Sequence, residues 1–104
     1  PQNINQMIRQ AQKMQEQMQA LQEELNAREY EVSAGGGMVK IKINGERRIL
    51  SVSIDPDIVD PDDVETLEDI ITAGVNEAIK LVDDTNTAEM NRLTGGLGLP
   101  GGLF

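Results

Sequence analysis

The first 25 residues carry an apolar side chain at alternating spacings of three and four. This a/d heptad spacing predicts an α-helix with one apolar seam, and no Gly or Pro interrupts the chain between Pro1 and Ala34. A helix of ~24 residues is roughly 36 Å long, so it should overhang a domain of this size. The seam is expected to pack on the chain's own sheet or second helix, and part of it is free to pair with another subunit. It comprises Ile4, Met7, Ala11, Met14, Met18, Leu21 and Leu25.

Three short strands are predicted after this helix. Apolar and polar residues alternate from Glu29 to Ala34, which is typical of a strand with one buried face, and three consecutive glycines at 35–37 end it. A second strand is predicted over residues 38–43, and a third ends at about Ile54. The three strands are expected to form one antiparallel sheet.

Asn44-Gly45 predicts the turn between the second and third strands. This dipeptide favours a two-residue type I′ turn, because both central residues of that turn need a positive φ. Such a turn would place Lys42 opposite Arg47, a pair of like charges that something must compensate. Either Glu29 and Glu31 neutralise the lysines from the first strand, or the basic face is held for an anionic ligand, and both can hold. Alternation puts Lys40, Lys42 and Arg47 on that face and Arg48 at the rim of the apolar face.

The rest of the chain predicts a second long helix and a tail. Asp60 is the expected N-cap with Pro61 at the first helical position, and Thr94-Gly95 ends the helix. The fold class is therefore α+β: a long N-terminal helix, a three-stranded antiparallel sheet and a long C-terminal helix, with both helices against the sheet. Residues 1–94 are predicted to form a single domain, and residues 95–104 a flexible Gly-rich tail. The exposed edges of so small a sheet favour a dimer.

Charge is distributed unevenly between the two halves of the chain. The formal net charge is −9, which by itself argues against a nucleic-acid partner. Residues 1–54, however, contain seven basic and six acidic residues, whereas residues 55–104 contain two basic and twelve acidic ones. An anionic partner should therefore meet the N-terminal half.

The composition excludes most catalytic chemistry. The chain has no Cys and no His, which removes thiolate nucleophiles, the common zinc sites and the usual neutral-pH general base. The acids at positions 55–63 do not have the spacing of a calcium loop, and the Gly-rich stretches lack the Lys-Ser/Thr of a phosphate loop. We expect no enzyme activity, cofactor, metal or small-molecule substrate. The apolar runs are too short for a membrane span, so a cytoplasmic protein is expected.

Four segments, taken in order, carry a family resemblance. They are Met7–Met18, Gly36–Gly45, Val52–Pro56 and Leu67–Asp69, and together they resemble the YbaB/EbfC family of nucleoid-associated proteins over roughly residues 5 to 92. The resemblance implies a helix, three-stranded sheet and helix, assembled into a tweezer-like homodimer from which long helices project. It also implies binding of duplex DNA with little sequence preference in the bacterial nucleoid. The second helix departs from the family pattern, because it is acidic where relatives often carry Lys or Arg.

The DNA-binding residues are predicted from charge, since no family motif assigns them. Arg9 and Lys13 are four residues apart on a polar face of the first helix. With no recognition helix and no stacking aromatic residue, contacts should be to phosphates. The alternative function is a protein-interaction adaptor for a replication or recombination partner, with incidental DNA contact. The candidate DNA-binding residues are Arg9, Lys13, Lys40, Lys42, Arg47, Arg48 and Arg92.

Overall fold

The computed structural model of the chain describes residues 2–95 as an elongated α+β unit. The helix α1 (Gln2–Ala27) leads into the strands β1 (Glu29–Ala34), β2 (Val39–Asn44) and β3 (Ile49–Ile54). The short 3-10 helix η1 (Pro56–Ile58) and the helix α2 (Val64–Thr94) follow. The predicted fold class and element order are confirmed. The predicted tail, residues 95–104, lies outside the described residues except for Gly95.

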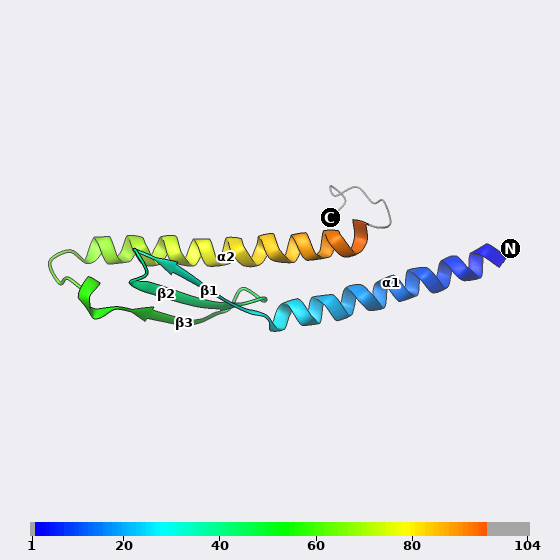
Figure 1. The fold of residues 1–104 in the computed structure, drawn as a ribbon, viewed down its shortest axis with the longest axis horizontal. Coiled ribbons are helices and arrows are strands. Elements are labelled where there is room, and N and C mark those ends of the chain that lie inside the picture. The colour runs from blue at the N-terminus through cyan, green and yellow to red at the C-terminus, as the bar shows by residue number, and fades with distance from the viewer. Residues whose placement is uncertain (1, 96–104) are drawn as a thin grey trace.

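The sheet is antiparallel with the order β1-β2-β3, and α2 covers one of its faces (Figure 1). Val39, Ile41 and Ile43 of β2 are fully buried against Ala78 and Val82 of α2. Gly74 lets the helix approach closely, because a Cβ there would lie 2.6 Å from Cδ1 of Ile41. The core therefore lies between the central strand and the middle of α2.

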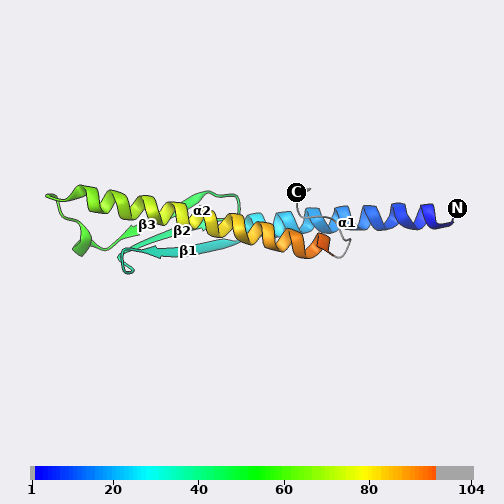
Figure 2. The same ribbon diagram turned by 90° about the horizontal axis from the view of Figure 1, so that it is seen from above.

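The helix α1 does not lie on the sheet, so the expectation of two helices against it is wrong. It leaves one end of the sheet and extends beyond the end of α2 in both views (Figures 1 and 2). The longest dimension of the chain is consequently 75 Å, against 23 and 15 Å for the other two. Only the C-terminal part of α1 is held firmly, through the fully buried Leu25. The predicted overhang is thus confirmed.

The turn after β2 differs from the predicted type I′ turn. The Arg47 N–H donates to the Asn44 carbonyl (3.0 Å), and Arg47 is the residue with a positive φ, at 66°. The Asn44 side chain accepts from the backbone N–H groups of Glu46 (2.9 Å) and Arg48 (3.1 Å). Gly45 itself does not have a positive φ. A glycine is needed here because a Cβ at this position would overlap the carbonyl oxygen of Leu25.

The longer turn and a β-bulge change the pairing of β3. Lys42 lies opposite Ser51, and Ile41 opposite Val52, so the predicted pair of Lys42 with Arg47 is wrong. The register shifts between Lys42 and Ile43, which makes Leu50 the extra residue on β3. The bulge keeps Ile43 paired with an apolar residue.

The start of α2 also differs from the prediction. Its N-cap is Asp63, whose carboxylate accepts from the Thr66 backbone N–H (3.3 Å) and the Thr66 hydroxyl (2.6 Å). Asp60 instead accepts from the N–H of Asp62 (2.9 Å) in the preceding turn, so the predicted Asp60 cap is wrong. Both aspartates satisfy the residue preference of a cap, and the chain uses the one directly before the apolar stripe of the helix.

The apolar face of β3 is largely uncovered. The helix α2 packs mainly on β1 and β2. Val52 and Ile54 lie opposite the buried Ile41 and Val39 and so share the apolar face of the sheet, to which Leu50 belongs by alternation with Val52. Leu50, Val52 and Ile54 nevertheless remain 40%, 41% and 36% exposed. We call these three residues the β3 shelf. An apolar shelf on an edge strand is a surface that soluble proteins normally cover.

Candidate nucleic-acid interface

The projecting part of α1 presents two cations to solvent. Arg9 and Lys13 are both exposed, and neither takes part in an ion pair within residues 2–95. Each is two residues from Ala11, about 200° around the helix, so both lie on the face opposite the apolar seam. The pair is therefore available to an anion even if the seam is covered.

A second pair of cations lies on the face of the sheet away from α2. Lys40 and Lys42 are exposed and point away from the buried face of β2. Glu31 lies directly opposite Lys42, but Glu29 lies opposite Asn44, and no glutamate comes within ion-pair distance of either lysine in the described chain. The predicted neutralisation is thus limited to one cross-strand neighbour. Glu29 and Glu31 are the acidic residues of this face, and serines of β1 and β3 occupy the positions opposite Lys40 and Lys42 that remain.

The remaining three candidate residues differ in their surroundings. Arg48 is exposed at the start of β3 and has no ion pair in the part of the chain that the structure describes. Arg47 points toward α2, where its Nε lies 2.8 Å from Asp83 Oδ1, so its predicted place beside the lysines is wrong. Arg92 on α2 has Nη2 3.3 Å from Glu89 Oε1. Two of the seven candidates therefore already have an acidic partner.

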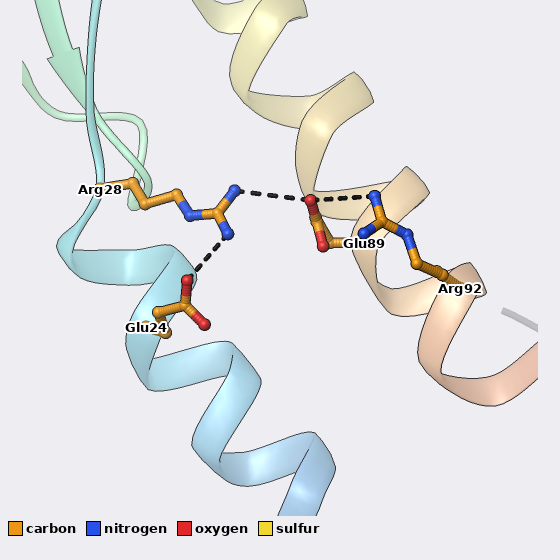
Figure 3. A network of polar contacts seen from close by, with 4 residues as sticks. All are labelled: Glu24, Arg28, Glu89 and Arg92. Carbon is orange, nitrogen blue, oxygen red and sulfur yellow. Dashed lines mark hydrogen bonds and ion pairs between the residues drawn. The ribbon is translucent and has the colours of Figure 1, made fainter.

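Arg28 forms a polar network that sequence reasoning missed. Its Nη2 lies 2.8 Å from Glu24 Oε1 and its Nη1 3.6 Å from Glu89 Oε1, which Arg92 also contacts (Figure 3). The hydrogen bond to Glu24 raises the pKa of Arg28 above its usual value, and the charge of Glu89 acts in the same direction. The network joins the base of α1 to α2. The Glu24 spacing of four was visible in the sequence, but the contact with Glu89 depends on the fold.

A polar hollow of about 640 Å³ lies beside this junction. Its wall includes Gly45, Arg47, Asp83 and Asn86, and the Asn86 side chain donates to the Gly45 carbonyl (3.2 Å). The Gly45 N–H in turn donates to the carbonyl of Arg28 (2.9 Å). These contacts join α1, the β2–β3 turn and α2 at one point, which fixes the direction of the projecting helix.

The described residues form neither a metal site nor a membrane span. Among residues 2–95, no three acidic side chains gather closely enough to hold a metal ion. Neither helix of the described chain combines the length and the hydropathy that crossing a bilayer would require. The exposed cations remain the chemically distinctive groups of this surface.

Comparison with known proteins identifies the family. The profile of the YbaB/EbfC DNA-binding family matches residues 1–97. The chain belongs to the YbaB/EbfC family. A nucleoid-associated protein of Clostridium novyi is 56% identical over 99 residues, which cover 95% of this chain and 87% of that protein. A second one, from Thermoanaerobacter pseudethanolicus, is 52% identical and covers 95% of this chain and 89% of its own.

A solved structure supports the fold of this YbaB/EbfC member. An uncharacterized protein of Helicobacter pylori matches with a TM-score of 0.71 over 86% of this chain and 94% of its own, at 20% sequence identity. The likeness concerns the fold alone. The family inferred from the four sequence segments is confirmed, and the description of the family is that of DNA-binding proteins.

Proposed function

We propose that the chain binds duplex DNA as a homodimer with little sequence preference, mainly through phosphate contacts, and thereby alters the organisation of DNA in the nucleoid. The observation that carries this proposal is the set of exposed cations without an acidic partner in the described chain. Two lie on the projecting helix, two on the outer sheet face, and the fifth directly before β3. They are Arg9, Lys13, Lys40, Lys42 and Arg48.

Contacts to phosphate fit this surface better than contacts to base edges. Tyr30 packs against the core, so within residues 2–95 no aromatic side chain is available to stack on a base. The cations lie on α1, on β2 and directly before β3, and contacts from separate elements suit the repeated charge of a DNA backbone.

The homodimer is proposed to form over the β3 shelf. A second copy offers the same shelf, so a two-fold arrangement would remove both apolar surfaces from water. The projecting helices would then remain free of the interface, as the tweezer-like assembly implied by the family resemblance requires.

A charged residue in the shelf is expected to separate the protomers. Val52→Asp would bury a carboxylate in the proposed interface, and we expect light scattering to give the monomer mass for this variant and the dimer mass for the unmodified chain. Ser51→Asp is the matched control, because it adds the same charge on the opposite face of the same strand, opposite Lys42. Equal masses for the two variants would place the dimer interface elsewhere.

The proposed DNA binding is tested by retardation of a generic duplex at low and at near-physiological salt. A phosphate binder should lose affinity steeply, with a log-log slope of about −0.9 per phosphate contacted. Exchanging the base sequence of the duplex should leave the affinity within a few-fold. An affinity for DNA that does not change with salt, or absence of binding at low salt, would favour the adaptor function. The exposed seam of α1 is the structural support for that alternative.

A further inference from the structure

The N-terminal part of α1 exposes apolar side chains that nothing in the described chain covers. Ile4 is 61% and Met7 65% exposed, although both lie on the apolar seam. An open groove of about 350 Å³ runs along this seam. Its floor is the small side chain of Ala11, and Met7 and Met14 stand on either side of it along the helix axis. The β3 shelf lies at the other end of the molecule, so a dimer formed there leaves this seam uncovered.

The seam is complementary to itself when two copies run antiparallel. Antiparallel helix pairs place an a position of one helix against a d position of the other. Setting Met7 of one copy against Ala11 of the second fills the groove with a side chain of matching size, and it sets Ile4 against Met14. This register uses only residues 4–14, before the part of α1 that lies beside α2 (Figure 1).

Charge permits the same pairing. The positions that flank the seam between residues 4 and 15 are Ile8, Gln10 and Gln15, which are uncharged. Two copies with a net charge of −9 each can therefore approach along this face without like charges meeting. Arg9 and Lys13 lie on the opposite face of the helix and stay exposed in the pair.

We propose that the α1 seam docks α1 of a second dimer in this antiparallel register, so that neighbouring dimers on DNA are linked through their projecting helices. The inference rests on the proposed DNA-binding function, and it adds an interface beyond the dimer. Eleven residues span only about 16 Å, so the paired seams bury less area than a stable complex needs. The link forms when DNA holds dimers close together, because the effective concentration then replaces intrinsic affinity.

The test compares Met7→Glu with Gln6→Glu. Both variants add one negative charge to the same turn of α1, but Gln6 lies on the face opposite the seam, so only Met7→Glu places a charge in the proposed interface. Each is titrated on a duplex of roughly 20 base pairs, which at 3.4 Å per pair is roughly 68 Å long, and on one several times longer. The short duplex is shorter than the 75 Å chain and limits side-by-side binding.

We expect Met7→Glu to lose cooperativity on the long duplex, with an affinity on the order of ten-fold lower than that of the unmodified chain. Gln6 lies three residues before Arg9, so Gln6→Glu is expected to weaken phosphate binding on both duplexes. The affinity of each variant for the long duplex is therefore compared with its own affinity for the short one, and on that scale Gln6→Glu should keep the cooperativity of the unmodified chain. Equal cooperativity of the two variants on the long duplex would overturn the inference.

A DNA-free measurement separates this inference from the proposed function. If the unmodified chain binds no duplex, the proposed function fails. The proposed pairing of two α1 seams is then tested by sedimentation at millimolar protein concentration. Assembly beyond the dimer that Met7→Glu abolishes and Gln6→Glu keeps would support the seam. Absence of such assembly in the unmodified chain would overturn it.

Discussion

Replacing Arg9 and Lys13 together by alanine is expected to weaken DNA binding strongly and to flatten its salt dependence. If both cations of one projecting helix contact phosphates, the log-log slope becomes shallower by about 1.8, and by about 3.6 if both helices of a dimer do so. At roughly 0.1 M salt the smaller value corresponds to a loss of affinity on the order of 60-fold. Fluorescence anisotropy with a labelled duplex at four or five salt concentrations measures both quantities.

The matched control removes two cations that already have acidic partners. Lys80 Nζ lies 3.2 Å from Asp84 Oδ2, and Arg92 contacts Glu89, so Lys80→Ala with Arg92→Ala changes the net charge by the same amount. We expect this control to change the salt slope by less than half as much, since its effect on DNA is only long-range. If the two double variants behave alike, net charge governs binding, and the assignment of the site to α1 is refuted.

Gly45→Ala is expected to be the most destabilising Gly→Ala substitution among residues 2–95. The new Cβ would overlap the carbonyl oxygen of Leu25, a backbone atom that cannot rotate away. The base of α1 would have to move, breaking the bonds from Gly45 to Arg28 and from Asn86 to Gly45. We expect a loss of at least about 3 kcal/mol in the free energy of unfolding, measured by urea titration followed by circular dichroism.

Two other glycines provide the controls for that measurement. Gly95 has a helical φ of −59° and open space around its Cα, so Gly95→Ala should change stability by less than about 0.5 kcal/mol or increase it. Gly36 also has open space, but its φ of +68° makes Gly36→Ala cost about 1 to 2 kcal/mol. A Gly45→Ala variant as stable as Gly95→Ala would show that the base of α1 can shift without penalty.

The fold was largely predictable because each element has its own local pattern. The period of the apolar residues changes from helical to two at Glu29, and three glycines separate the first two strands. The turn at Asn44-Gly45 was not predictable in detail, because Gly45 serves the approach of α1 and not its own φ. The preference for glycine in turns does not tell whether the residue supplies a positive φ or avoids a steric overlap. The turn geometry differs between the two cases, and the positions of the β3 side chains depend on it.

The candidate site was predictable in part for a related reason. Arg9 and Lys13 lie on a helix that projects into solvent, so their exposure follows from the heptad phase alone. The pairing of Arg47 with Asp83 and the joint contact of Arg28 and Arg92 with Glu89 link distant parts of the chain. They depend on the β3 register and on how α2 crosses the sheet, and neither is encoded in a local pattern.

The elongated shape has a hydrodynamic consequence. The radius of gyration of one chain is 20.0 Å, whereas a compact protein reaches that value only at roughly 330 residues. Elution from a gel-filtration column follows the Stokes radius, which elongation also raises, so a single 11.4 kDa protomer should elute earlier than globular standards of its own mass. An elution volume that suggests an oligomer is thus the expected behaviour of a monomer of this shape, and only a method that weighs the particle, such as light scattering or sedimentation equilibrium, counts its subunits.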